Sequence, residues 1–356
     1  PVALATGLGQ LAFTIVFGYG IALALSMSAL EALYVAVALT FSSTIIIVKL
    51  LSDKRELDSL HGRIALGFLI VQDIAVVVAM MVLGSLRGEV PGAAWPMVLL
   101  SVTWRMLLAV ALVGILMRWV LPPVMRVVAR SPELMVVFAV AWGTALAAIG
   151  ELAGFSMEVG AFLAGFSLAS SDFREAMSSR LASVRDFLLL FFFVELGAEL
   201  ELHRLGDQLW DAAVLSVFVL VGNPLIVMAI MGYMGYARRT GFLAGLTVAQ
   251  ISEFSIVFTA MGISLGHVTG STLGLVTLVG MVTITLSTYM ILNSHALYRV
   301  LEPWLGFFER ERPYRELRDE AMGSGSVGAP EVVIYGIGRY GGRLLRQLAH
   351  LGVPVV

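Results

Sequence analysis

The chain has 356 residues, of which 59% are hydrophobic and only 13% are charged. Soluble domains carry about 25% charged residues, so the composition excludes an ordinary soluble protein and favours one that crosses a membrane several times. The absence of cysteine excludes disulfides, thiolate metal sites and cysteine nucleophiles. The net charge of −2 gives no basic footprint for nucleic acid. The chain begins Pro1-Val2, without Met or a basic segment, so we expect no signal peptide and a segment of a longer protein.

Ten apolar runs are candidates for membrane-spanning helices, each of which needs about 20 apolar residues. They cover residues 3–25, 32–51, 63–84, 99–121, 133–152, 156–170, 185–200, 211–234, 240–263 and 270–294. The sixth and seventh runs are short for a span, which predicts that they are tilted or buried between neighbours. We therefore assign residues 1–295 to a transmembrane domain.

Basic residues alternate between the loops that separate these segments. The loops after the second, fourth, sixth and eighth segments hold Lys54, Arg55, Arg63, Arg118, Arg126, Arg130, Arg174, Arg180, Arg185, Arg238 and Arg239. The intervening loops hold only Arg87 and Arg204. Because basic loops stay in the cytoplasm, this alternation predicts a multi-pass protein of the cell (inner) membrane, with both ends of this segment in the cytoplasm.

The composition changes after residue 295. Residues 299–320 mix five arginines with six acidic residues, which is typical of a solvated amphipathic helix. Residues 323–326 read Gly-Ser-Gly-Ser, a flexible linker. We assign residues 296–329 to a cytoplasmic amphipathic helix and linker.

Residues 330–356 predict a strand, a glycine turn, a helix and a second strand, which is the start of a Rossmann-like α/β domain. Gly336, Gly338 and Gly341 lie where the phosphates of a nucleotide would meet the helix N-terminus. These glycines could instead serve only the close packing of strand and helix. The acidic residue that binds the ribose is expected beyond residue 356, so we expect no cofactor bound to this segment alone.

The first three and the last three segments are offset by an odd number of spans, which predicts an inverted repeat. Their second members have the most polar centres, at residues 40–44 and 247–255. Interrupted helices at matching positions of inverted halves indicate the binding site of a transporter. To complete the first half, we expect about three further helices before residue 1.

Two carboxylates lie deep in these segments. Asp73 comes ten residues after Arg63, which is about 15 Å along a helix and half the depth of a bilayer core of about 30 Å. Glu253 lies twelve residues inside its segment, and Ser43 and Asn223 lie near the middle of theirs. A buried carboxylate can hold a proton or a desolvated cation but not both, which is the basis of antiport.

The candidate ion and proton ligands are the two acids and the polar residues of the interrupted segments. They are Ser42, Ser43, Thr44, Gln72, Asp73, Asn223, Gln250, Ser252 and Glu253. Hydroxyls and freed carbonyls at residues 42–44 would supply oxygen ligands for a monovalent cation.

Each of these residues also has a structural alternative. Asp73 could cap a broken helix or pair with Gln72, and Glu253 could be a hydrogen-bond partner of its polar segment. The hydroxyls at residues 42–44 could bond back to their own helix. Asn223 could satisfy the carbonyl that Pro224 leaves free.

Four motifs, in this order, resemble those of the second monovalent cation:proton antiporter family. They are Thr40-Phe-Ser-Ser-Thr44, Gln72-Asp73, Gly160-Ala-Phe-Leu-Ala-Gly165 and Ala249-Gln-Ile-Ser-Glu-Phe254. The chain is most similar to the Kef-type potassium/proton antiporters, which end in a TrkA-N-like (RCK) nucleotide-binding domain. The resemblance covers essentially the whole chain.

This resemblance implies an all-α inverted-repeat cation/proton antiporter fold with two broken crossing helices, a homodimer and an elevator-like movement. It also implies that Asp73 carries the ion and the proton, and that a regulatory nucleotide, NAD(H) or AMP/ATP, binds the complete C-terminal domain. Related proteins that move sodium electrogenically have two adjacent acids in place of Gln72-Asp73, and many have Lys in place of Asn223. These departures favour the exchange of one cation for one proton.

The sequence therefore predicts a secondary antiporter, and not an enzyme, that exchanges K⁺, or with less preference Na⁺, for H⁺ across a lipid bilayer. A ligand-gated potassium channel, controlled through residues 336–341, is the alternative. A membrane-bound nicotinamide oxidoreductase is disfavoured because no His, Cys or Tyr catalytic set accompanies the glycine motif.

Overall fold

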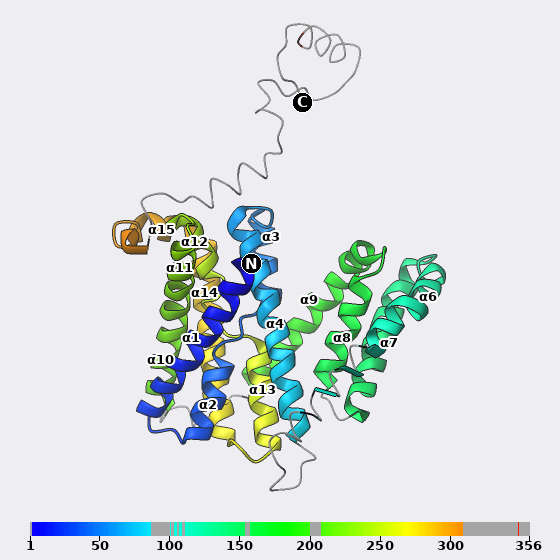
Figure 1. The fold of residues 1–356 in the computed structure, drawn as a ribbon, viewed down its shortest axis with the longest axis horizontal. Helices are drawn as coiled ribbons and strands as arrows, with labels where there is room; N and C mark the ends of the chain where they lie inside the picture. The colour runs from blue at the N-terminus through cyan, green and yellow to red at the C-terminus, as the bar shows by residue number, and fades with distance from the viewer. Residues whose placement is uncertain are drawn as a thin grey trace.

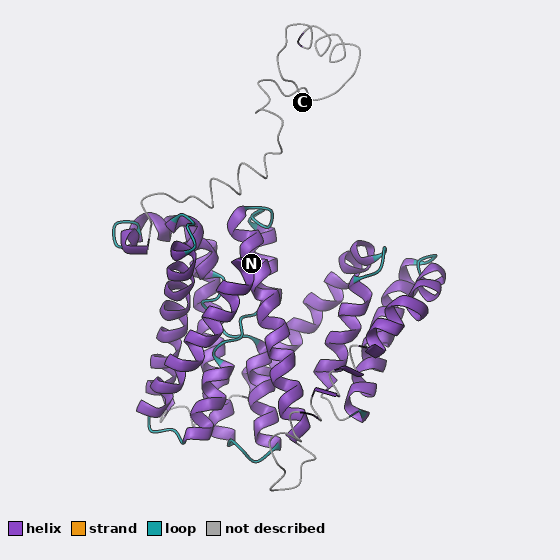
Figure 2. Ribbon diagram, in the orientation of Figure 1, coloured by secondary structure: helices purple, strands orange, loops and turns teal. Residues whose placement is uncertain are grey.

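The computed structural model describes residues 2–86, 100, 103–104, 107–108, 111–153, 157–199, 208–308 and 348. Every regular element in these ranges is helical (Figure 2). The elements are α1 (Val2–Ala24), α2 (Ala29–Ala38), α3 (Thr44–Asp53), α4 (Leu60–Leu86), η1 (Leu116–Val120), α6 (Leu121–Val128), α7 (Pro132–Leu152), α8 (Met157–Ala169), α9 (Arg174–Glu199), α10 (Leu209–Val217), η3 (Phe218–Gly222), α11 (Asn223–Tyr233), α12 (Arg238–Leu246), α13 (Glu253–Ser264), α14 (Gly270–Leu292), α15 (Ser294–Leu301) and η4 (Leu305–Phe308).

The predicted all-α polytopic fold is confirmed. Six helical stretches of the described residues are long and apolar enough to cross a membrane: Val2–Ala24, Leu60–Leu83, Ala111–Val128, Pro132–Leu152, Leu209–Tyr233 and Gly270–Leu292. Three shorter apolar helices, Ala29–Ala38, Val159–Ala169 and Glu253–Ser264, lie in three of the remaining predicted segments, and α9 lies in the fourth. Helices α2 and α3 form one interrupted helix, and α12 and α13 form the other. The protein is therefore a multi-pass membrane protein.

Two segments differ in length from the prediction. The seventh begins at Arg174 rather than at residue 185, because a charged, serine-containing stretch continues the helix outside the apolar run. The fourth continues to Val128 rather than ending at residue 121. Pro122 and Pro123 do not stop it, because they occupy the first turn of α6, where proline costs no helical hydrogen bond.

The helices form two groups (Figure 1). In the larger group, α1 packs against α2, α4 and α11, while α13 packs against α2, α4 and α14. In the smaller group, α7 packs against α8 and α9. The larger group holds two buried apolar clusters, one around Met80 and Phe258 and the other around Phe68 and Met228.

Two helices of the larger group are interrupted in the interior. Residues 39–43 separate α2 from α3, and residues 247–252 separate α12 from α13; we call them the first break and the second break. Figure 2 shows such non-helical segments in the middle of the bundle. The two interrupted helices touch, since Ser255 Oγ at the start of α13 donates to the carbonyl oxygen of Ala38 at the end of α2, at 2.6 Å. This contact brings the partially positive end of one helix to the partially negative end of the other.

The predicted basic loops lie at one end of the molecule. The connections α3–α4, α6–α7, α8–α9 and α11–α12 are all at the upper end in Figure 1, and α1–α2 and α13–α14 are at the opposite end. The sequence alternation therefore corresponds to a real alternation in the fold.

The region after α14 differs from a continuous helix over residues 299–320. α15 ends at Leu301, a turn follows at residues 302–304, and η4 is a short 3-10 turn. Pro303 lacks the N–H group that would continue α15. The rest of this prediction, the linker and the nucleotide motif with Gly336, Gly338 and Gly341 lie outside the described residues.

Candidate functional site

Asp73 lies midway along α4 and faces the first break. Thr44 Oγ1 donates to both carboxylate oxygens of Asp73, at 3.1 and 3.0 Å. Because Thr44 is the first residue of α3, the carboxylate lies at a helix N-terminus, whose partial positive charge favours an anion. Asp73 is half-buried. It is not paired with Gln72, whose amide nitrogen donates to Gln10 Oε1 instead.

The first break holds two buried hydroxyls without partners. Ser42 and Ser43 are 2% and 0% exposed, and neither Oγ has a hydrogen-bond partner among the described residues. Ser43 occupies the N-cap position of α3, yet its side chain does not cap the helix. The alternative that these hydroxyls bond back to their own helix is therefore wrong for Ser42 and Ser43, as it is for Thr44.

Glu253 is the second carboxylate near this site. It is the first residue of α13 and is half-buried. Ser252 Oγ donates to Glu253 Oε2 at 3.1 Å and accepts from the backbone N–H of Phe254 at 3.2 Å. Glu253 and Asp73 lie on helices that pack against each other, α13 and α4. The structure thus brings the two predicted acids and both breaks to one region.

Gln72 and Asn223 lie instead in a buried chain of hydrogen bonds that passes through α1. Gln72 Nε2 donates to Gln10 Oε1 at 2.6 Å, and Gln10 Nε2 donates to Thr14 Oγ1 at 3.0 Å. Thr14 Oγ1 donates to Asn223 Oδ1 at 2.7 Å, and Asn223 Nδ2 donates to the carbonyl oxygen of Val248 at 3.3 Å. Asn223 thus meets a carbonyl of the second break, and not one freed by Pro224 in its own helix.

Sequence reasoning missed Gln10 and Thr14. Both are buried in α1, at 1% and 0% exposed. Their spacing of four residues in an otherwise apolar helix places them on one face, which was the signal available in the sequence.

Gln250 is held by α14. Ser287 Oγ donates to Gln250 Oε1 at 2.7 Å, and the backbone N–H of Ile251 donates to Thr283 Oγ1 at 3.3 Å. The amide nitrogen of Gln250 has no partner among the described residues. The predicted supporting role of Gln250 in an ion site stays a prediction.

Glu253 lines a cavity of about 420 Å³ between the two helix groups. Its walls are Ile45 of α3, Val140 of α7, Glu253 of α13, and Leu181, Val184, Arg185 and Leu188 of α9. Arg185 also lines this cavity, and its guanidinium forms an ion pair with Asp186, in which the nitrogen and oxygen atoms are 2.8 Å apart. Among these lining residues, only Arg185 and Glu253 carry charge.

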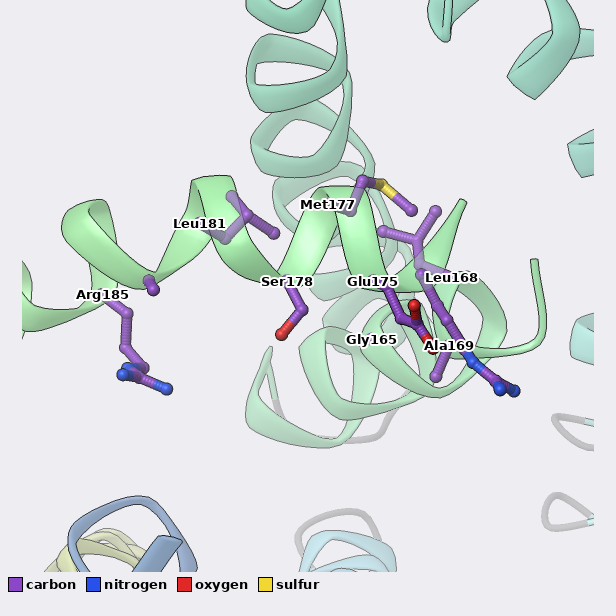
Figure 3. Close-up of a pocket in the computed structure, with 10 residues that line it drawn as sticks. Gly165, Leu168, Ala169, Glu175, Met177, Ser178, Leu181 and Arg185 are labelled. Atoms are coloured by element: carbon purple, nitrogen blue, oxygen red, sulfur yellow. The ribbon is translucent and has the colours of Figure 1, made fainter. Parts of the chain in front are cut away.

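A second cavity, of about 530 Å³, adjoins the first along α9. It lies between α8 and the first turns of α9, and Figure 3 shows Ser178 and Arg185 projecting from the same side of that helix. Leu181 and Arg185 line both cavities. The two cavities therefore follow α9 from its N-terminal turn towards Glu253.

The side chains of this region can hold a monovalent cation or a proton. Carboxylate and hydroxyl oxygens are ligands for a hard cation, and the carboxylates also accept protons. Among the residues that the structure describes, no three His, Asp or Glu side chains cluster as ligands for a resident metal.

Comparison with known proteins identifies the family. Residues 1–293 match the family model described as "Sodium/hydrogen exchanger, transmembrane". The chain belongs to this exchanger family. The family is one of transporters and not of enzymes, and the predicted resemblance to cation/proton antiporters is confirmed.

Several relatives are similar to this chain over most of its length. K(+) efflux antiporter 6 of Arabidopsis thaliana is 28% identical over 67% of the chain and 41% of the relative. The glutathione-regulated potassium-efflux system protein KefC of Klebsiella aerogenes is 33% identical over 63% of the chain and 36% of the relative. The iron transporter MagA of Paramagnetospirillum magneticum is 28% identical over 74% of the chain and 60% of the relative. The chain thus spans about two fifths of the length of the first two relatives.

Proposed function

We propose that this exchanger is a secondary antiporter that trades a monovalent cation for protons, with Asp73 carrying each in turn. The observation that carries this proposal is the position of Asp73: a half-buried acid in mid-helix, bonded to Thr44 at the first break. When the carboxyl group is protonated, it has no charge with which to hold a cation. When it is ionised, it needs a cation to offset the cost of a charge inside the membrane.

The first break supplies the other ligands in this proposal. The hydroxyl oxygens of Ser42 and Ser43 are buried and unpartnered, and leaving a buried polar group without a partner costs about 1–3 kcal/mol. A desolvated cation would meet that need, together with the Asp73 carboxylate. Glu253 lines the cavity along α9 and would connect the site with water at the N-terminal end of that helix.

We favour K⁺ over Na⁺. Two of the relatives described above are named for potassium efflux, and Gln72 beside Asp73 leaves one acid where two would allow two-proton exchange. Exchange of one K⁺ for one H⁺ at a single carboxyl group moves no net charge. The name of the third relative refers to iron, which makes selectivity the first property to measure.

We further propose that the protein is a homodimer in the bacterial inner membrane, with the basic loops and both ends of this segment in the cytoplasm. In the complete C-terminal domain, a nucleotide at residues 336–341, NAD(H) or AMP/ATP, would bias transport through the segment that follows α15. Removal of everything after residue 322 should then abolish the response of transport to nucleotide. An unchanged response to nucleotide in the truncated protein would contradict this coupling.

The transport proposal is tested by reconstituting the full-length protein in liposomes and following internal pH after a pulse of K⁺ or Na⁺. Wild type should move protons against the cation, and Asp73→Asn should reduce the rate to that of empty liposomes. Asp53→Asn is the matched control, because Asp53 is an exposed partner of Lys49, and it should exchange like wild type. Wild-type rates in Asp73→Asn would overturn the carboxylate mechanism. Cation flux without proton movement would indicate a channel.

A further inference from the structure

Gln72, Gln10, Thr14, Asn223 and the Val248 carbonyl form a chain that we call the relay. Every side chain in it is at most 1% exposed. Its members come from four places in the fold: α4, α1, α11 and the second break. The relay therefore links the helix that carries Asp73 to the break that precedes Glu253.

The hydrogen bonds of the relay all run in one direction. Each member donates to the next, beginning with the Gln72 amide nitrogen and ending at the Val248 carbonyl oxygen. Hydrogen bonds in such a chain polarise one another and strengthen cooperatively in a low-dielectric interior. The direction fixes the Gln72 amide with its nitrogen in the chain and its oxygen outside it.

The first member of the relay, Gln72, has a hydrogen-bond acceptor without a partner. Gln72 Oε1 is buried and has no hydrogen-bond partner among the described residues. An amide that donates through its nitrogen gains negative charge on its oxygen, so this atom is a strengthened oxygen ligand. Gln72 directly precedes Asp73 in α4.

We propose that Gln10, Thr14 and Asn223 are positioning residues that hold the Gln72 amide with its oxygen available to the cation. They set cation affinity without touching the cation themselves. This inference rests on the proposed function, because it assumes that a cation binds in the region of Asp73. If the relay were broken, the Gln72 amide would be free to turn and present a donor where an acceptor is needed.

Thr14 is the best position for a test, because its hydroxyl both accepts from Gln10 and donates to Asn223. Thr14→Val keeps the shape of the side chain and removes both bonds, whereas Thr14→Ser keeps the hydroxyl. Thr6→Val is the matched control: Thr6 is 0% exposed on the same face of α1, and its Oγ1 has no partner among the described residues.

The measurement is the half-saturating K⁺ concentration, with choline replacing K⁺ at constant ionic strength. It is read from liposome exchange and, independently, from the rise in Tm that K⁺ causes in the purified full-length protein. Thr14→Val should raise this concentration about tenfold, which corresponds to about 1.4 kcal/mol, the size of one buried hydrogen bond. The maximal rate should change less than about twofold, and Thr14→Ser and Thr6→Val should resemble wild type.

Wild-type K⁺ dependence in Thr14→Val, in both readouts, would overturn the relay. If Thr14→Val does not fold, Gln10→Met breaks the relay one position nearer Gln72, and unchanged K⁺ dependence in that variant would overturn it equally. A third outcome separates the two proposals: wild type does not exchange K⁺ for protons, but K⁺ still raises its Tm and Thr14→Val weakens this effect. That result would contradict the proposed function and would leave the relay supported. The two proposals therefore fail in different ways.

Discussion

The two breaks differ in how far their polar groups are already satisfied. In the first break, Ser42 and Ser43 are buried with unpartnered hydroxyls. In the second, the Val248 carbonyl accepts from Asn223, and the Ile251 N–H group donates to Thr283. The Gln250 amide nitrogen there is buried and has no partner among the described residues, but it is a donor and cannot hold a cation. The first break is thus open to a ligand, whereas the second is held by side chains of α11 and α14. Two interrupted helices can therefore serve different purposes: in our proposal the first break supplies ligands, and the second is a scaffold.

The close approach of α12 to α11 is the part of the scaffold where we expect the largest effect on stability. A Cβ atom at Gly245 would lie 2.8 Å from the backbone oxygen of Pro224, whereas one at Gly241 would be 3.5 Å from the nearest atom, in ordinary contact. Gly245→Ala should therefore destabilise the protein by about 2–3 kcal/mol, because the backbone must move. Thermal unfolding in detergent measures this, with Gly241→Ala as the control that should remain near wild type. Equal Tm values for the two variants would contradict the scaffold described for the second break.

The next effect concerns the hydrogen bond from α14 to the second break. Thr283→Val leaves the buried N–H group of Ile251 without an acceptor and should cost about 1–2 kcal/mol. Thr285→Val is the control, since Thr285 is exposed and bonds only back to Met281 in its own helix. Thermal unfolding should separate the two variants, while the half-saturating K⁺ concentration should stay within about twofold of wild type in both. A large loss of K⁺ affinity in Thr283→Val would mean that the second break is also a ligand source.

The positions of both breaks were predictable, and most of their partners were not. Polar runs at residues 40–44 and 247–255 stand out in apolar segments, and Asp73 stands out by its charge and depth. The bond from Thr14 to Asn223, by contrast, joins residues 209 positions apart. Because one polar residue in an apolar helix has no local partner, only the packing of α1 against α4 and α11 determines what it meets.

The first interrupted helix is also anchored at its far end, where it joins α4. Lys54 Nζ donates to the carbonyl oxygen of Ile291 at 2.9 Å and pairs with Glu56 at 3.2 Å. Glu56 also meets His295 at 2.8 Å and His61 at 3.2 Å. This cluster ties the α3–α4 connection to the junction of α14 and α15.

Glu56 makes this anchor dependent on pH. Burial alone would raise the pKa of its carboxyl group, but the hydrogen bond with His295, the charge of Lys54 and the bonds with His61 and Lys54 together lower the pKa below its ordinary value. A lowered folded-state pKa stabilises the fold above the unfolded value of about 4.3, and this contribution is lost as pH falls through the folded pKa.

Glu56→Gln should therefore lower the stability of the protein at pH 7 by about 1 kcal/mol or less, a smaller effect than at either scaffold position. The difference in Tm between wild type and this variant should shrink as pH falls below about 4.3. Asp53→Asn, which removes an exposed pair with Lys49, should have little effect at any pH. A difference in Tm that grows on acidification would show that the sign of this linkage is wrong.

The smallest effect on stability is expected at the first break itself. Ser43→Ala removes a buried hydroxyl without a partner and should leave Tm unchanged or slightly raised. Ser255→Ala is the matched comparison, because the Ser255 hydroxyl donates to the Ala38 carbonyl, and it should lower stability by about 1 kcal/mol. In the exchange assay, Ser43→Ala should raise the half-saturating K⁺ concentration more than Ser255→Ala does. The reverse order in both measurements would mean that the first break is not the ligand source.

The most direct measurement of the central claim, that one carboxyl group holds either a proton or a cation, is proton release on cation binding. K⁺ is added to the purified full-length protein in weakly buffered detergent solution, at a pH where the site is protonated, and released protons are counted with an indicator dye. Our account predicts proton release that saturates with K⁺, disappears in Asp73→Asn and persists in Asp53→Asn. Release of protons from Asp73→Asn as large as that from wild type would contradict it.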